Sequence, residues 1–260
     1  PPSFNTVIAT VTVGDGPAGI VVTPDSSRVY VTNEDAGTVS VISAATNTVT
    51  ATIPVGNSPE GIAITPDGSR VYVANIFSNT VSVIDTASNT VVATVSVGLG
   101  PVGVAVAVTS GGTFVYVTNQ FSDSVSVIDT ATNTVVATVV VGNFPTGIAI
   151  ANDFFTGFAV RAYVANQLSN DVSVIDISTN TEFPDFDPST PERDRIAVGT
   201  SPDFVAIFSE TSGFLAYVTN FGSGDVTKID INPFSQDFHK SAGSISVDRR
   251  PEGIAIRIPP

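Results

Sequence analysis

The chain repeats itself along almost its whole length, and this repetition limits the folds that it can adopt. In each unit a proline precedes a short related segment, which reads EGIA in the second unit. These segments begin at Ala18, Glu60, Val102, Thr146, Asp203 and Glu252. The five tyrosines fall one per unit, at Tyr30, Tyr72, Tyr116, Tyr163 and Tyr217. The segments are 42 residues apart at first (18 to 60) and 57 apart later (146 to 203), and such a period predicts a repeat architecture.

Each unit contains four short runs rich in Val, Ile and Thr, separated by turn residues. In the second unit the runs are Gly61–Thr65, Arg70–Ala74, Thr80–Asp85 and Thr90–Val97. Their β-branched side chains favour strands, and segments such as VYVAN and VSVID alternate with a period of two. Four strands joined by short turns in every unit predict the blades of an all-β propeller, with almost no helix.

The strand count predicts five complete blades and a split sixth blade. If the strands of a unit are called a to d, the chain begins with a d strand and ends with an a strand. The complete blades are predicted at residues 17–55, 59–97, 101–141, 145–198 and 202–248. The split blade would combine residues 6–13 with 251–258 and would lack its two middle strands. We therefore expect a single domain over residues 1–260 with six blades, five or seven being the alternatives.

The split blade has three explanations. The chain is cut from a longer repeat protein, or another chain fills the sixth blade, or five blades close the ring and leave spare end strands. An unfilled blade exposes strand edges, which recruit strands from neighbours. The candidate assembly edge consists of Thr6, Val7, Ile8, Val11, Gly253, Ile254, Ile256 and Ile258.

Several segments resemble the YVTN-type β-propeller repeat family, which includes surface-layer and other cell-surface proteins of archaea and bacteria. They read RVYVTN, NTVSVID, TATNTVVATVVVG and PEGIAITPDGSRVYV. The resemblance covers nearly the whole chain and implies a propeller, usually of seven blades. Such propellers serve as surface scaffolds, adhesion modules and occasionally enzyme-like domains, so the resemblance leaves the function open.

Loop length distinguishes the two ends of the predicted blades. The b–c and d–a connections keep one length, whereas the a–b and c–d loops lengthen in blades three to five, as at Asn152–Val160, Thr181–Asp194 and Asn232–Lys240. Loops carry function on a rigid scaffold. Aromatic side chains on these loops either contact a partner or fold back and fix their own loops. They are Phe154, Phe155, Phe158, Phe183, Phe186, Phe234 and Phe238.

One asparagine follows the second strand of every unit. Asparagine tolerates a left-handed backbone and bonds nearby backbone groups, so a turn cap is the favoured interpretation. A ring of amides around a central funnel that binds a polar ligand is the alternative. The five residues are Asn33, Asn75, Asn119, Asn166 and Asn220.

The composition argues against catalysis and against a cofactor. With one histidine and no cysteine, zinc sites of the usual type cannot be built. The histidine, His239, is predicted to be solvated in its loop beside Lys240. Four acidic residues crowd one insertion, but their spacing fits an ordinary acidic loop better than a calcium site. These are Asp185, Asp187, Glu192 and Asp194.

The charge and hydropathy exclude further classes of partner. A net charge of −14 argues against nucleic acid and against anionic membrane surfaces. No run approaches the roughly 18 apolar residues of a membrane span. The abundance of Thr, Ser, Val and Asn and the near absence of lysine fit an extracellular protein of a bacterium or archaeon.

The sequence thus predicts a non-enzymatic extracellular protein that acts as a surface-layer or filament subunit. It would assemble with copies of itself or with another cell-surface protein, through the incomplete blade and the long loops. A propeller module that binds a small molecule, a glycan or a protein is the alternative. A lyase-like or lactonase-like enzyme is the weaker alternative, because histidines are nearly absent.

Overall fold

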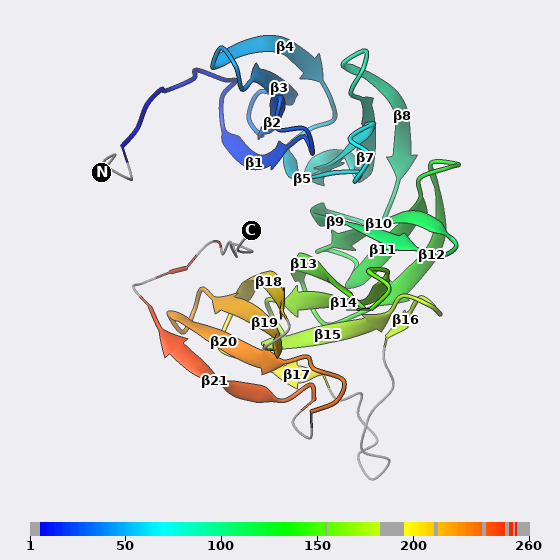
Figure 1. The fold of residues 1–260 in the computed structure, drawn as a ribbon, viewed down its shortest axis with the longest axis vertical. Helices are drawn as coiled ribbons and strands as arrows, with labels where there is room; N and C mark the ends of the chain where they lie inside the picture. The colour runs from blue at the N-terminus through cyan, green and yellow to red at the C-terminus, as the bar shows by residue number, and fades with distance from the viewer. Residues whose placement is uncertain are drawn as a thin grey trace. The chain divides into compact units, whose positions relative to one another are not determined.

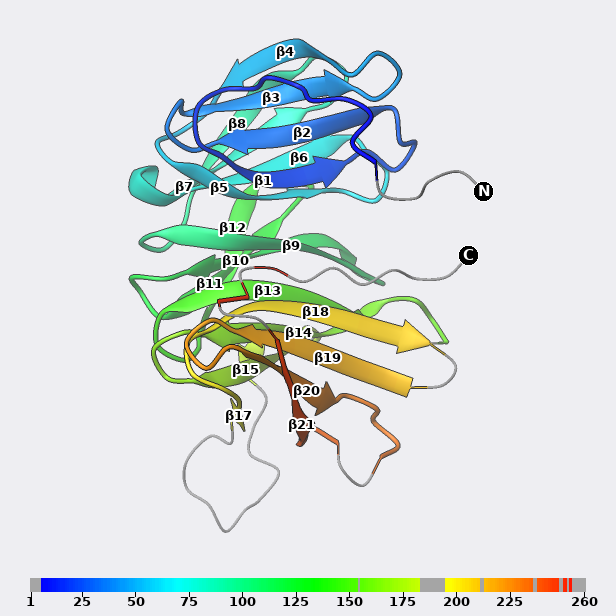
Figure 2. The same ribbon diagram turned by 90° about the vertical axis from the view of Figure 1, so that its left-hand side faces the viewer.

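Five antiparallel sheets form the fold of the described chain (Figures 1 and 2). The computed structural model describes residues 6–153, 155–182, 195–210, 213–235, 238–247, 250, 251 and 253. Within these residues the one helical element is a short 3₁₀ turn, η1 (Ile76–Ser78). The all-β prediction is therefore confirmed, and no helix among these residues is long and apolar enough to cross a membrane.

The first compact unit, residues 1–95, holds two sheets. The first sheet consists of β1 (Pro17–Val22), β2 (Arg28–Asn33), β3 (Thr38–Ser43) and β4 (Thr48–Pro54). The second consists of β5 (Pro59–Ile64), β6 (Arg70–Asn75), β7 (Thr80–Asp85) and β8 (Thr90–Ser96).

The second compact unit, residues 96–260, holds three sheets. The first consists of β9 (Pro101–Thr109), β10 (Gly112–Asn119), β11 (Ser124–Asp129) and β12 (Thr134–Val140). The next consists of β13 (Pro145–Asn152), β14 (Ala159–Asn166) and β15 (Asp171–Asp176), with the short strands β16 (Thr181–Glu182) and β17 (Ile196–Ala197) both paired to β15. The last consists of β18 (Pro202–Glu210), β19 (Gly213–Asn220), β20 (Asp225–Asp230) and β21 (Ser241–Ser246).

Each sheet follows the chain order, as the blades of a propeller do. The five predicted blades are confirmed as five sheets. The expected outer strand at residues 6–13 is wrong, because these residues pair with no described strand and form none. The strand expected to complete the split blade, residues 251–258, lies mostly outside the described residues. A single domain and a six-bladed ring stay predictions.

Inner strands carry apolar side chains on both faces where their sheet packs between two neighbours, as the sheet that contains β14 does. In β14, Ala162 and Val164 join the core with the β9–β12 sheet, whereas Tyr163 and Ala165 join the core with the β18–β21 sheet. Successive residues of a strand point to opposite faces, so both sets are buried without polar alternation. Fully burying a valine side chain such as Val164 stabilises the fold by roughly 1.5–3 kcal/mol.

The repeated tyrosine joins one sheet to a turn of the next. The hydroxyl of Tyr30 donates to Oδ1 of Asn89 at 2.8 Å, and the hydroxyl of Tyr116 donates to Oδ1 of Asn180 at 2.5 Å. Both asparagines have a φ of 53°, in the left-handed region that asparagine tolerates. Each buried phenol thereby keeps a hydrogen-bond partner while its ring fills the core.

The repeated asparagine is buried inside its own sheet. All five side chains are 0% exposed. The amide of Asn33 donates to the hydroxyls of Thr38 and Ser40, both at 3.0 Å, and the amide of Asn220 donates to Asp225 at 2.9 Å and Thr227 at 2.8 Å. The alternative of a ligand-binding ring at Asn33, Asn75, Asn119, Asn166 and Asn220 is therefore corrected, since these amides hold the turn between strands b and c.

A glycine from the preceding d–a connection lies directly on each of these amides. A Cβ added at Gly142 would come within 2.4 Å of the Asn166 side chain, and one at Gly56 within 2.7 Å of the Asn75 side chain. The backbone N–H of Gly56 also donates to Oδ1 of Asn75 at 3.1 Å. The contact requires a residue without a side chain, which explains why Val-Gly ends the d-type segment before each of the five sheets.

Replacing Gly142 by alanine should lower the free energy of unfolding by about 1–3 kcal/mol, because the added methyl group overpacks the buried amide of Asn166. Denaturant titration followed by circular dichroism measures this change. Gly111→Ala is the matched control, since its Cβ would meet Thr109 at an ordinary 3.7 Å. Equal stability of the two variants would contradict the packing role.

Candidate functional site

Long hairpins distinguish the second unit from the first. Strands β9 and β10 have nine and eight residues, whereas β5 and β6 have six each. Part of the segment expected to be a long loop is therefore strand in the structure. The two-residue turn Ser110–Gly111 joins β9 to β10. The β13–β14 hairpin is extended in the same way, with eight residues in each strand. The longer strands extend these hairpins beyond the end of the sheets, and side chains of the two hairpins line a cavity there.

A cavity of about 860 Å³ lies between these hairpins, within the second unit. Its apolar walls include the side chains of Phe114, Phe155, Phe158, Phe214, Phe234, Ile177 and Ile231. Its polar lining includes Ser110, Asn152, Asp153, Arg161, Asp176, Ser178 and Asn180. A mostly apolar cavity with a few charged groups is typical of small-molecule sites.

The predicted aromatic contact residues lie partly in this cavity. Phe155 and Phe234 line it and are each 80% exposed, and Phe158 lines it at 40% exposure. Phe238 instead packs on its own loop, with its ring stacked 3.8 Å from the imidazole of His239. The remaining three, Phe154, Phe183 and Phe186, lie outside the described residues.

Arg161 and Asp176 bring opposite charges to one place in the cavity lining. They are direct partners in the antiparallel pairing of β14 with β15, so their side chains project from the same face of the sheet. Ser178 donates its backbone N–H at 2.8 Å and its hydroxyl at 2.6 Å to Oδ1 of Asp176, which fixes the carboxylate. The guanidinium of Arg161 lies 5.0 Å from the centre of the Phe238 ring. An aromatic face thus supports the cation.

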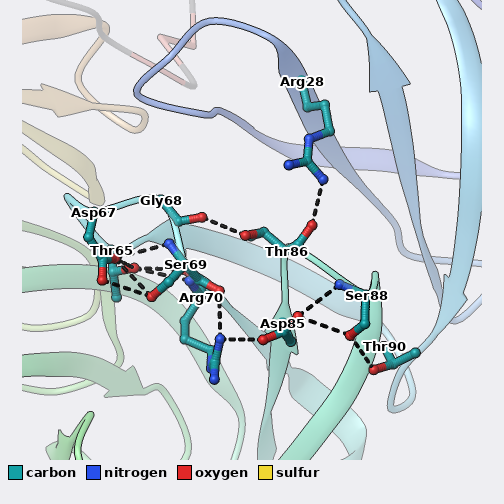
Figure 3. A network of polar contacts seen from close by, with 10 residues as sticks. All are labelled: Arg28, Thr65, Asp67, Gly68, Ser69, Arg70, Asp85, Thr86, Ser88 and Thr90. Atoms are coloured by element: carbon teal, nitrogen blue, oxygen red, sulfur yellow. Dashed lines mark hydrogen bonds and ion pairs between the residues drawn. The ribbon is translucent and has the colours of Figure 1, made fainter.

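The corresponding positions of the first unit form a polar network instead (Figure 3). Arg70 and Asp85 occupy the same paired positions of β6 and β7 and form an ion pair. Arg28 donates to the carbonyl of Thr86, whose hydroxyl donates to the carbonyl of Gly68 at 2.6 Å. The arginine–aspartate ion pair thus lies within the second sheet, and Arg28 joins the first sheet to it.

Asp153 adds a second carboxylate to the cavity. Its Oδ1 accepts the backbone N–H of Thr156 at 2.9 Å and the hydroxyl of Thr156 at 3.0 Å. These hydrogen bonds hold the pKa of Asp153 below its usual value, with the backbone bond as the main cause. The carboxylate is therefore ionised at neutral pH and stabilises the turn that carries Phe155 and Phe158.

His239 lies behind the cavity wall and is not the solvated loop residue that the sequence predicts. It is partly buried, and a hydrogen bond of 2.8 Å joins its Nε2 to the hydroxyl of Tyr163. With a φ of 61°, it takes the position that Asn89 and Asn180 hold beside the tyrosines of other repeats. Burial, followed by the positive charge of Arg161, lowers the pKa of His239 to about 3.

Reasoning from the sequence missed the charged groups of this site. Arg161 follows the pattern of Arg28 and Arg70, one arginine at the start of a b strand, and Asp176 ends a c strand as Asp85 does. That recurrence could have suggested that Arg161 and Asp176 are paired. It could not show that longer hairpins would place this arginine–aspartate pair in a cavity. No group of three or more histidine, cysteine, aspartate or glutamate side chains suited to a metal occurs in the described part of the chain. The acidic insertion once considered for calcium lies outside it.

Comparison with known proteins identifies the family. Residues 3–153, more than half of the chain, match the model of the Lactonase family, described as a seven-bladed β-propeller. The chain belongs to the lactonase family. No curated protein shows significant similarity to it. The match supports a propeller family but not the YVTN type in particular, and five sheets are described where the family has seven blades.

Solved structures share the propeller fold at low sequence identity. A functionally unknown protein from Desulfotomaculum acetoxidans DSM 771 has a TM-score of 0.71 and 18% identity, over 92% of this chain and 74% of that one. U3-55K has a TM-score of 0.71 and 16% identity, over 90% and 65%. The dihydro-heme d1 dehydrogenase NirN, in complex with DHE, has a TM-score of 0.64 and 17% identity, over 90% of this chain but 47% of its own. Similarity at this level shows the fold alone.

Membership of the lactonase family corrects the prediction that the protein is not an enzyme. That prediction rested on the scarcity of histidine and the absence of cysteine. Ester hydrolysis needs a base for water and a cation or hydrogen-bond donor for the developing oxyanion, and carboxylate and guanidinium groups can serve in these roles. The similarities give no support to the predicted surface-layer or filament role.

The burial of His239 predicts that its imidazole does not become protonated near the ordinary pKa of 6.5. Because the folded pKa lies near 3 and the ordinary value is 6.5, the unfolded state binds more protons between these pH values. The contribution of this group to stability is therefore present above pH 6.5 and is lost as the pH falls towards 3. NMR of the one imidazole should show no protonation down to about pH 4.

The control for this prediction is His239→Asn, which installs the type of residue that Tyr116 contacts in the turn of the next repeat. The variant should keep the contact with Tyr163, and its stability should decline less between pH 6.5 and 3 than that of the unmodified chain. An imidazole that titrates near 6.5 would show that the residue is solvated after all.

Proposed function

We propose that this protein is a lactonase-like hydrolase that opens small cyclic esters in the cavity of its second unit. The observation that carries the proposal is the opposed pair of Arg161 and Asp176 in the lining of a largely aromatic cavity. Family membership supports hydrolysis of this kind of bond, and the cavity supports a small molecule as the substrate. The YVTN-type relationship and the extracellular location stay predictions.

The cavity suits a compact ligand with an apolar ring and a polar edge. Its volume of about 860 Å³ falls in the usual range for small-molecule sites. Phe155, Phe158 and Phe234 offer ring faces and edges to an apolar ring system. Arg161, held against Phe238, offers N–H donors in a fixed plane to a carbonyl or carboxylate oxygen. With apolar rings on one side and the Arg161 guanidinium on the other, the cavity orients a cyclic ester with its carbonyl towards β14 and β15.

The chemistry assigns one role to each member of the pair. Asp176 accepts a proton from water as the water oxygen attacks the carbonyl carbon, and Arg161 stabilises the negative charge that develops on the carbonyl oxygen. The ring C–O bond then breaks, and the leaving oxygen takes the proton from Asp176. The product is a hydroxy acid, which releases one proton at neutral pH. Ser178 keeps the carboxylate in place throughout.

Replacing Asp176 by asparagine should lower kcat for lactone hydrolysis by about 10²–10⁴-fold, because the amide cannot accept the proton. Proton release in a pH-stat, with a panel of five- and six-membered lactones, measures the rate. Asp129→Asn is the matched control, since Asp129 ends the same strand of the preceding repeat and accepts the N–H of Ala131 at 2.8 Å but lies outside the cavity lining.

The control should retain the rate of the unmodified chain. Equal losses in both variants would assign Asp176 a turn-holding role alone. No hydrolysis of any lactone by the unmodified chain, together with no binding of the panel by calorimetry, would refute the proposed function. Thermal unfolding of each variant separates a loss of chemistry from a loss of fold.

A further inference from the structure

We propose that the cavity of the second unit takes cyclic esters that carry an alkylated ammonium group, and that Asp153 and exposed phenylalanines of the lining bind this group. The ester part of this inference rests on the proposed hydrolase activity, whereas binding of the cation can be tested without it. The ammonium site lies at the tip of the β13–β14 hairpin and is distinct from the pair of Arg161 and Asp176.

The charged side chains that line the cavity do not balance. Among the described lining residues they are Asp153, Asp176 and Arg161, which supply two carboxylates and one guanidinium. Arg161 and Asp176 lie opposite each other in the pairing of β14 with β15. Asp153 forms no ion pair with a described residue, and its lowered pKa keeps it ionised at neutral pH. The excess negative charge favours a cationic ligand over a neutral or anionic one.

One oxygen of the Asp153 carboxylate is available to a ligand. Its Oδ1 accepts the N–H of Phe155 at 3.1 Å in addition to both groups of Thr156, whereas Oδ2 accepts no hydrogen bond from a described residue. In the corresponding turn of the first unit, the hydroxyl of Ser69 lies 2.9 Å from both Oδ1 and Oδ2 of Asp67. The short turn therefore occupies both oxygens of its carboxylate, and the longer turn leaves one for a cation.

Three phenylalanines line the cavity with exposed rings. Phe155 and Phe234 are each 80% exposed, and Phe158 is 40% exposed. The N–H of Asp153 donates to the carbonyl of Phe158 at 2.7 Å, so these two residues lie side by side at the base of the turn. The face of an aromatic ring attracts a cation, and aromatic side chains recognise methylated ammonium ligands in this way. Rings next to an ionised carboxylate thus suit a group that is both charged and covered by methyl groups.

The β13–β14 hairpin sets the separation between the two ends of the ligand. In its register Ala151 lies opposite Arg161, and Asp153 follows two residues nearer the tip. Two residues of strand span about 7 Å. A ligand whose carbonyl accepts a hydrogen bond from Arg161 and whose cation reaches Asp153 therefore carries the ammonium group on a short side chain of its ring.

The test of the cation site compares choline with neohexyl alcohol, in which a carbon atom replaces the nitrogen of choline without a change of shape. Isothermal titration of the full chain should give a dissociation constant at least about tenfold lower for choline, because the rings and the carboxylate act on its charge. Equal affinities would overturn the proposal. So would the absence of choline binding at millimolar concentration.

Asp153→Asn removes the charge and keeps Oδ1 as an acceptor for the turn. It should lower the preference for choline over the alcohol by about threefold or more. Asp67→Asn is the matched control, since it makes the same change of charge in the corresponding turn of the first unit, outside the cavity lining. An equal loss in both variants would assign the preference to the net charge of −14 and overturn the site.

Phe234→Leu tests the ring independently of the carboxylate. The side chain is 80% exposed, so the substitution is not expected to affect folding. It should lower the preference for choline by about twofold to fivefold, because leucine offers apolar surface but no ring face. An equal weakening of choline and of the alcohol would show that the ring contributes apolar area alone, and would contradict its role in binding the cation.

The substrate class is tested with a γ-lactone that carries a trimethylammoniomethyl group and with its neopentyl analogue. In a pH-stat, kcat/KM should be at least about tenfold higher for the cationic lactone, and Asp153→Asn should reduce this difference through KM. Equal rates would overturn the substrate class and leave the hydrolase activity standing. A preference for choline without hydrolysis of either lactone would refute the proposed function, and with it the substrate class, while the cation site would stand.

Discussion

The structure depends on the close packing of neighbouring sheets within each unit. Strands with apolar side chains on both faces need neighbouring sheets to cover those side chains, so no sheet of this kind can stand alone. The tyrosine hydroxyl that reaches the next sheet and the glycine that lies on the next asparagine make this packing specific. The same dependence explains why an outer-strand sequence without a central strand beside it forms no strand at residues 6–13.

The repeats made the fold predictable, because every unit presents the same alternation and the same turn residues. The five sheets follow from that regularity. The prediction at residues 6–13 was wrong because a strand is defined by its partner, and sequence pattern alone does not supply one. The asparagines were assigned two alternatives because an amide in a turn has the same sequence context whether it faces solvent or, as here, is completely buried.

The candidate site was less predictable than the fold. The long loops and their phenylalanines pointed to one end of blades three to five, and three of those rings line the cavity at that end. The charged pair was missed, because Arg161 and Asp176 look like the structural pair Arg70 and Asp85. Longer hairpins, and not a change of residue type, account for the different surroundings. The scarcity of histidine also led to a wrong prediction, because it argued against an enzyme whereas the chain belongs to the lactonase family.

The contact between each glycine and the buried asparagine of the next sheet has a consequence for how such a protein can change. It ties the d–a connection to the b–c turn, so an insertion at that end would separate two sheets. At the opposite end the described contacts between sheets run from the tyrosine to the c–d turn, as from Tyr30 to Asn89, and the longer β9–β10 and β13–β14 hairpins lie there. Directed evolution of a new ligand specificity should therefore randomise the β9–β10 and β13–β14 hairpins and keep the Val-Gly and Asn positions constant. The repeat thus places the hairpins that can vary in length and sequence at one end of each blade, and the Gly–Asn contacts between sheets at the other.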